Sequence, residues 1–406
     1  MPFCRRVMPI HFFFFLASNA LKSLVVAMMS VALGWHLYQA TGDPIHLAMI
    51  GLMQIIPVFV FFFATGWVVD TFSRKKILIF CAAFDAIVLC GISAVMLSET
   101  LSLTVLFSLI FAHGSVMALY FPSSQAIIPN IVSEEQIRQA IALSSTTSNV
   151  ARTAGPVVAG VLIAVIDFHI YTLMTLLMSV AAISYLLLPK LPQLSATSRS
   201  WESIVGGLRF VISNSIVLGA IALDLFIVML GSVMVLLPIY ASDILKVGPE
   251  ELGILRAMPA FGAVAVGVLL AKSGEMRRCG YKLFISLVVF GASIILFGVS
   301  TNFWLSVFAL FVYGAADMVS VNIRLSLIQI ATPDNLRGRV SAVNGIFISS
   351  SNEMGDVRSG ALTALIGPVA TAVVGGIMAV GVVVAGGLFF TKLRKLDKIN
   401  DAAASR

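Results

Sequence analysis

Long apolar segments are the feature that most constrains the fold of this chain. Of its 406 residues, 59% are hydrophobic and only 11% are charged, and the mean hydropathy is +1.02. That is too little polar material to cover a water-soluble globule. A helix needs roughly 20 apolar residues to cross the hydrocarbon core of a bilayer. Twelve such segments are centred near residues 24, 57, 87, 114, 150, 179, 227, 261, 290, 317, 351 and 380.

The apolar segments are continuous and lack the alternation of a transmembrane β-barrel. Inside lipid every backbone polar group must be satisfied within the protein, so only helices remain. The sequence therefore predicts an all-α polytopic membrane protein with twelve transmembrane helices. Two arginines near the amino end precede an apolar stretch without a small-residue cleavage site, and we interpret this stretch as the first helix.

The positive charge of the chain is distributed unevenly between its loops. The net charge is +7, but most of the 26 lysines and arginines lie in alternate loops, and Lys246 is the one basic residue in the intervening loops. The positive-inside rule then places both termini in the cytoplasm and the protein in the cytoplasmic (inner) membrane. This distribution argues against a nucleic-acid partner, for which a continuous basic surface is typical.

The chain repeats itself at an interval of about 200 residues. The matched positions are Gly114 with Gly314, Arg138 with Arg337, and Gly155 with Gly355. We therefore predict a six-helix bundle over residues 1–189, a cytoplasmic linker over 190–210, and a second six-helix bundle with a short tail over 211–406. Duplicated halves make a monomer sufficient for function.

A short charged turn separates the second and third apolar segments. It reads Gly66-Trp-Val-Val-Asp70-Thr-Phe-Ser-Arg74-Lys75-Lys76. The turn resembles the Gly-x-x-x-Asp signature with following basic residues that marks the major facilitator superfamily, although Thr71 and Ser73 stand where Arg and Gly are usual. The resemblance implies that Gly66 gives a close helix contact and that Asp70, Arg74 and Lys75 form a latch for one conformation. The alternative is that the basic residues simply mark the cytoplasmic boundary between two membrane-spanning helices.

The resemblance to the major facilitator superfamily spans essentially the whole chain. Residues 32–36, 223–226, 314–320 and 337–344 resemble the enterobactin-exporter (transmembrane secretion effector) group. Gly155-Pro156, followed by Gly160, is similar to a signature of antiporting members, although Ala151 and Ala159 replace two of its glycines. The resemblance implies two six-helix halves, a substrate site between them and alternating access. For Gly155 and Pro156, tight helix packing with a kink is the alternative to a gating role.

Ionisable residues within predicted spans are expensive and tend to mark a pathway. Those of the amino half are Lys22, Asp85 and Arg152; those of the carboxyl half are Asp224, Arg256, Asp317, Arg324, Glu353, Asp356 and Arg358. A proton carrier must change protonation state in the physiological range. Asp224, with no basic residue within two turns along the chain, is the first candidate, followed by Asp317 and Glu353.

Each of these acids also has a structural interpretation. Asp224 is alternatively a buried ion-pair partner of Arg256 or Lys22. We expect Asp317 to pair with Arg324, and Glu353 with Arg358, as structural or gating pairs rather than as proton carriers.

Candidate substrate-binding residues are polar or charged side chains in otherwise apolar helices. They are Asn19, Lys22, Arg152, Arg324 and Asp356. Lys22 and Arg152 suit an anionic ligand such as a catecholate or carboxylate siderophore. Either of them is alternatively a counter-ion for Asp85 or Asp224.

The function predicted from the sequence is secondary active transport. We expect a proton-coupled exporter of an amphipathic small molecule such as a siderophore, drug or metabolite. An uptake symporter, a lipid transporter and a non-transporting sensor or scaffold are the alternatives. No phosphate-binding loop or hydrolase motif supports an enzyme, and the four cysteines have no paired or metal-binding spacing, so we expect no catalytic residue, cofactor, metal or disulfide.

Overall fold

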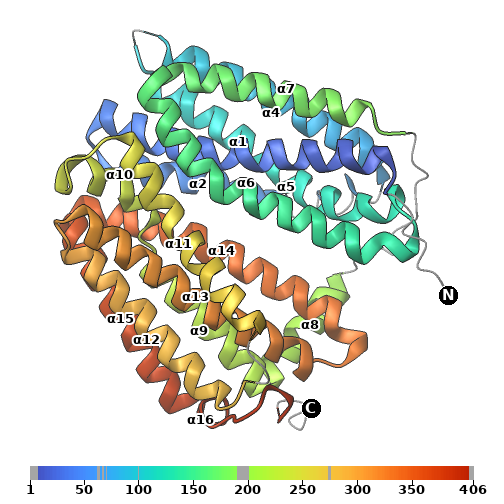
Figure 1. Cartoon of the computed structure of the whole chain (residues 1–406), viewed down its shortest axis with the longest axis vertical. Helices are drawn as coiled ribbons and strands as arrows, with labels where there is room; N and C mark the ends of the chain where they lie inside the picture. Colours follow the sequence, from blue (N-terminus) through green and yellow to red (C-terminus); the bar gives the residue numbers. More distant parts are fainter. Residues whose placement is uncertain are drawn as a thin grey trace. The chain divides into compact units, whose positions relative to one another are not determined.

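The structure is a computed structural model, and it describes residues 8–61, 65, 68–69, 71–98, 100–189, 201–272 and 276–401. Nearly all of these residues lie in helices (Figure 1). The chain divides into two compact units. Unit 1 contains residues 1–36 and 53–198, and unit 2 contains residues 37–52 and 199–406. Unit 2 thus includes the end of the first helix and the start of the second.

Six long helices come from the amino half of the chain. They are α1 (Ile10–Thr41), α2 (Pro44–Val60), α4 (Arg74–Met96), α5 (Leu103–Ile131), α6 (Ile137–Ile166) and α7 (Ile170–Leu186). Two short 3-10 helices, η1 (Glu134–Gln136) and η2 (Asp167–His169), precede α6 and α7. Within unit 1, α4 packs along both α5 and α7.

The carboxyl half contributes the remaining elements. They are α8 (Trp201–Ser213), α9 (Ser215–Gly231), η3 (Met234–Leu236), α10 (Leu237–Ile239), the π-helix η4 (Tyr240–Ile244), α11 (Pro249–Lys272), α12 (Cys279–Val299), α13 (Phe303–Ala331), α14 (Asp334–Ile366), α15 (Pro368–Phe389) and α16 (Thr391–Arg394). In unit 2, α13 packs on α11 and α12, and α15 packs on α12 and α9. The Asn214 side chain caps α9 by accepting hydrogen bonds from the backbone N–H groups of Ile216 and Val217.

Each of the twelve predicted spans coincides with one helix, in the order α1, α2, α4 to α7, α9 and α11 to α15. Nine helical stretches of the described chain are long and apolar enough to cross a membrane by themselves. One of the nine joins α6 and α7, whereas α2 has 17 residues and α14 carries several charged side chains. The all-helical, polytopic fold class predicted from the sequence is confirmed.

Helix α8 occupies the second part of the segment predicted as a linker. Residues 190–200 lie outside the described residues, but from Trp201 the chain is helical. Gly207 of α8 lies so close to α14 that a Cβ added there would be 3.0 Å from the carbonyl oxygen of Arg339. The stretch is therefore a packed element of unit 2 over its described part.

The repeated glycines mark equivalent helix contacts in the two halves. A Cβ on Gly114 of α5 would lie 2.8 Å from the carbonyl oxygen of Gln54 in α2, and one on Gly314 of α13 would overlap the carbonyl of Pro259 in α11. In the same way, a Cβ on Gly155 of α6 would lie 3.2 Å from the Leu24 carbonyl oxygen of α1. Close packing through small residues is how membrane helices associate without a hydrophobic driving force.

The last of the repeated glycines completes this correspondence. A Cβ on Gly355 of α14 would lie 3.0 Å from the Val228 carbonyl oxygen of α9. The fourth helix of each half therefore contacts the second, and the fifth contacts the first. Pro156, which follows Gly155 inside α6, is buried at its contact.

We predict that Gly314→Ala lowers the thermal stability of the purified protein, because its Cβ would meet backbone atoms of Pro259 that cannot move aside. Overpacking of this kind costs about 1 to 3 kcal/mol. The matched control is Gly381→Ala in α15, where a Cβ would have no neighbour within 4 Å. Thermal unfolding in detergent, followed with a thiol-reactive dye that reports the buried Cys81 and Cys279, measures both. Equal stability of the two variants would contradict the packing account.

Candidate functional site

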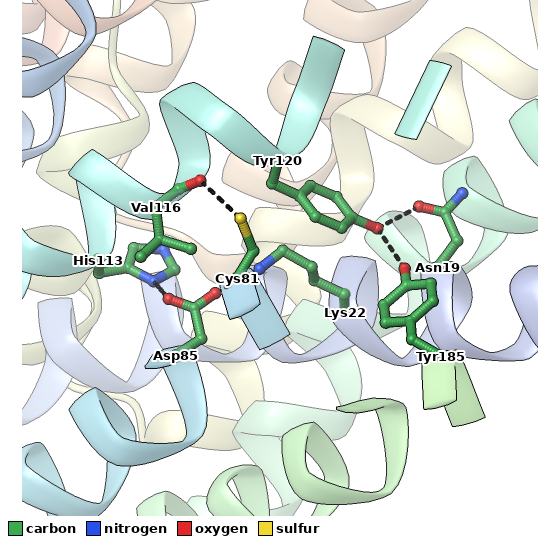
Figure 2. A network of polar contacts seen from close by, with 8 residues as sticks. All are labelled: Asn19, Lys22, Cys81, Asp85, His113, Val116, Tyr120 and Tyr185. Atoms are coloured by element: carbon green, nitrogen blue, oxygen red, sulfur yellow. Dashed lines mark hydrogen bonds and ion pairs between the residues drawn. The ribbon is translucent and has the colours of Figure 1, made fainter. Parts of the chain in front are cut away.

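A buried polar network occupies the interior of unit 1 (Figure 2). Lys22 of α1 forms an ion pair with Oδ2 of Asp85 on α4, and the exposed fractions of the two side chains are 1% and 0%. The other carboxylate oxygen of Asp85 lies 3.0 Å from Nδ1 of His113 on α5. Three helices are therefore joined through one carboxylate.

Tyr120 extends this network along α5. The ammonium group of Lys22 lies 4.3 Å from the centre of the Tyr120 ring, a cation–π distance. The Tyr120 hydroxyl donates a hydrogen bond to Oδ1 of Asn19 at 2.6 Å and lies 3.0 Å from the Tyr185 hydroxyl of α7. Asn19 in turn donates to the hydroxyls of Ser144 and Ser148 on α6, at 3.1 and 2.8 Å.

Helical spacing explains why these side chains meet. Asn19 and Lys22 are three residues apart on α1, and His113 and Tyr120 are seven apart on α5, so each pair shares one helix face. A charged group in an apolar interior is stable only when it is paired and hydrogen-bonded. The network meets that condition for Lys22 and Asp85, and it holds α1, α4, α5, α6 and α7 together.

The two cations predicted within spans of the amino half, Lys22 and Arg152, lie in different environments. Lys22 is the counter-ion of Asp85, which was one of the two alternatives predicted for it. The Arg152 side chain on α6 is exposed. It lies near enough to Tyr120 to interact with it electrostatically. Arg152 thus lies beside the network but is not one of its buried members.

A second buried ion pair lies in unit 2. Arg324 of α13 pairs through Nη1 with Oδ2 of Asp224 on α9, and their exposed fractions are 3% and 7%. Nε of Arg324 is buried without a hydrogen-bond partner. The interpretation of Asp224 as a buried ion-pair member is therefore correct in kind, but its partner is neither Arg256 nor Lys22.

The predicted pair of Asp317 with Arg324 is wrong, because Arg324 contacts Asp224 instead. Seven residues along a helix correspond to a rise of about 10 Å, so two side chains on the same face at that spacing do not touch. Asp317, half-buried on α13, stays close enough to Asp224 and Arg324 to interact with both electrostatically.

The predicted pair of Glu353 with Arg358 is also wrong. Arg358 donates a hydrogen bond to the Ser359 hydroxyl at 3.0 Å, and its Nε and Nη1 atoms are buried without a partner. Five residues along a helix turn the side chain by about 140°, so residues at that spacing face different directions. Glu353 interacts electrostatically with Asp356, which is three residues further along α14.

Asp356 belongs to a third polar cluster at the junction of α9 and α14. It accepts a hydrogen bond from the Ser232 hydroxyl and interacts electrostatically with Arg256 of α11. The Ser359 hydroxyl donates to the carbonyl oxygen of Ser232 at 2.7 Å. The four acids predicted within spans of the carboxyl half, Asp224, Asp317, Glu353 and Asp356, therefore lie in unit 2 together with three buried or half-buried arginines, Arg256, Arg324 and Arg358.

The predicted latch is described only in part. Gly66 and Asp70 lie outside the described residues. Arg74 donates to the carbonyl oxygen of Ala126 at 3.0 Å and to Oδ1 of Asn130 at 3.1 Å, near the end of α5. Lys75 donates to the carbonyl oxygens of Leu186 and Leu188 at the end of α7. Basic side chains at the carboxyl end of a helix donate hydrogen bonds to the last carbonyl groups, which have no partner within the helix.

Sequence reasoning missed His113, Tyr120 and Tyr185. His113 is a polar residue in an apolar span, which is a usable signal, whereas two tyrosines do not stand out in a helix before the packing is known. Within the described ranges, no group of three or more His, Cys, Asp or Glu side chains is arranged to hold a metal ion.

A sequence model of the transmembrane secretion effector family matches residues 5–406. The chain belongs to this family. An enterobactin exporter of Shigella boydii is 26% identical to the chain over 348 residues, covering 84% of this chain and 82% of the exporter. An enterobactin exporter of Citrobacter koseri is 27% identical over 351 residues, with the same coverage.

Solved structures of membrane transporters share the fold. A nucleoside transporter superposes with a TM-score of 0.71 at 15% identity, covering 94% of this chain and 99% of that one. A peptide transporter gives 0.72 at 11% identity, with coverage of 98% and 97%. A bacterial homologue of the lysosomal transporter Spinster, in an inward-facing conformation, gives 0.69 at 14%, with 98% of both chains covered. This secretion effector is thus a multi-pass membrane transporter of the major facilitator fold.

We predict that Asp85→Ala strongly destabilises unit 1, because it leaves Lys22 buried without its carboxylate. Removing one member of a buried ion pair costs about 3 to 5 kcal/mol, whereas replacing both by apolar residues is often tolerated. The double variant Lys22→Met/Asp85→Leu should therefore recover most of the lost thermal stability. Asp334→Ala, which removes an acid 87% exposed at the surface, is the control and should change little. Additive losses in the double variant would contradict the pairing.

Proposed function

We propose that this protein is a proton-coupled exporter that moves an amphipathic small molecule by alternating access. Its membership of the secretion effector family and its similarity to enterobactin exporters over most of both chains are the observations that carry this proposal. We place it in the cytoplasmic membrane with both termini in the cytoplasm, acting as a monomer, in keeping with the positive loops and the duplicated halves.

The proposed substrate is a catechol-bearing or carboxylate siderophore, or a drug or metabolite of similar character. Support comes from Arg152, an exposed cation beside the hydroxyl and amide groups of Tyr120 and Asn19. An arginine and aromatic side chains suit a planar, anionic ligand. Lys22 contributes less to the proposed binding of an anionic substrate than the sequence suggested, because its charge is already neutralised by Asp85.

Proton coupling is proposed for the acids of unit 2, with Asp224 first and Asp317 and Glu353 after it. Antiport requires that the substrate and the proton exclude one another. An ionised carboxylate accepts strong hydrogen bonds from catechol hydroxyls, and protonation weakens them because it removes the charge and turns one oxygen into a donor. Asp317 lies near Asp224, and two ionised carboxylates repel each other until one is protonated. A proton that binds to this pair therefore weakens the binding of the substrate, which favours its release.

The Asp224–Arg324 ion pair suggests a specific mechanism for the alternative function, uptake by symport. If the substrate is an anion bound by Arg324, protonation of Asp224 frees Arg324 for it. Proton and substrate would then bind together, which is the behaviour of a symporter. Antiport predicts weaker substrate binding as the pH falls, and symport predicts stronger binding.

For the conformational cycle we propose that Gly66, Asp70, Arg74 and Lys75 act as a latch and that Gly155 and Pro156 act as a hinge. Arg74 and Lys75 hold the ends of α5 and α7 in the described conformation. Rigid helices tied at their ends can move as one body, which alternating access requires.

The proposed export is tested by comparing the spent medium of a strain lacking the gene with that of a complemented strain, with and without added iron. We predict a compound that is lost from the medium and retained in the cells of the deletion strain. Complementation by Asp224→Asn should not restore its export, whereas Asp334→Asn, at an exposed acid, should. Untargeted mass spectrometry of both fractions measures this. Matching exometabolomes in both media would overturn export of an endogenous compound.

A further inference from the structure

An open apolar groove lies between α11, α12 and α13 of unit 2. Its volume is about 750 Å³, which lies within the range of small-molecule sites. The walls are built from side chains of the three helices, including Val266 and Leu270 of α11, Ile285 and Val289 of α12, and Val312 and Val319 of α13. None of the ionisable residues proposed for transport lines it.

One end of the groove carries positive charge. Arg278 and Lys282, at the start of α12, line the groove, and both side chains are exposed. Arg278 is the N-cap of α12, and Lys282 lies in the first turn of the helix. Tyr281, 59% exposed, also lines the groove. Within the described part of the chain, neither side chain forms an ion pair with an acid.

The backbone beneath these residues is fixed. Arg278 has a positive φ of 53°, and its N–H donates to Oδ1 of Asp397 at 3.1 Å. The N–H groups of Cys279 and Gly280 donate to the carbonyl oxygens of Asp397 and Leu396, each at 3.0 Å. Asp397 is therefore engaged with the backbone of this segment, and Arg278 and Lys282 line the groove.

We propose that this groove binds one anionic phospholipid, with its acyl chains along the apolar walls and its phosphate between Arg278 and Lys282. The groove opens at the end of a membrane-spanning helix, which is the depth of lipid headgroups. Basic pockets between transmembrane helices bind anionic headgroups through this combination of charge and apolar surface. A zwitterionic lipid would bring its own cation against two unpaired cations, so a net negative headgroup is favoured.

The test is lipid retention by the purified protein in native mass spectrometry. The probes are phosphatidylglycerol and phosphatidylcholine with identical acyl chains. The wild-type protein should retain phosphatidylglycerol in preference to phosphatidylcholine. Arg278→Ala/Lys282→Ala should weaken phosphatidylglycerol retention by about 30-fold, as expected for the loss of two basic residues at a headgroup.

Two further variants separate a site from general surface charge. Lys76→Ala/Arg138→Ala removes two exposed basic residues from unit 1 and should leave retention unchanged. Ala315→Leu narrows the groove without altering its charge and should weaken retention of the lipid. Thermal unfolding checks that each variant is folded. Equal retention of the two lipids by the wild type, or an equal loss in the unit 1 control, would overturn the proposal. Neither result depends on whether the protein exports anything.

Discussion

A charged side chain that lies inside a membrane must find a partner there, and this constraint determines the interior of both units. One oxygen of the Asp85 carboxylate pairs with Lys22 and the other contacts His113, so a single carboxylate joins α1, α4 and α5. In unit 2, Arg324 satisfies Asp224 and joins α13 to α9. Because unpaired charges are so unfavourable in an apolar interior, these pairs fix which helix faces turn inward. The lipid-facing sides are then left to apolar residues.

Glycine contacts supply the close packing that the charges alone do not. Gly114 and Gly314 bring the fourth helix of each half against the second, and Gly155 and Gly355 bring the fifth against the first. The two halves thus repeat the same backbone contacts while carrying different charges. A shared framework of backbone contacts therefore supports a different polar interior in each half.

The sequence predicted the helices well and their polar partners poorly, for a physical reason. Hydropathy is a local property, so each of the twelve apolar segments identified its own helix. Ion pairs form between helices, and their partners depend on packing that a single sequence does not display. Asp317 and Arg324 share a face but lie too far apart along α13, and Arg324 turns to Asp224 of another helix instead. His113 stands out in the sequence as a polar residue in an apolar span, but its partner Asp85 depends on the packing of α4 against α5.

The proposed antiport requires that substrate and proton exclude one another at the acids of unit 2. This exclusion is measured most directly by the number of protons released when a catecholate siderophore, of the proposed substrate class, is added to the purified protein in a weakly buffered solution. Asp224→Asn, measured in parallel, subtracts protons that come from the ligand or from other groups. Antiport predicts that binding to the wild-type protein releases protons in excess of the variant. Proton uptake on binding, or identical release by both proteins, would contradict the account.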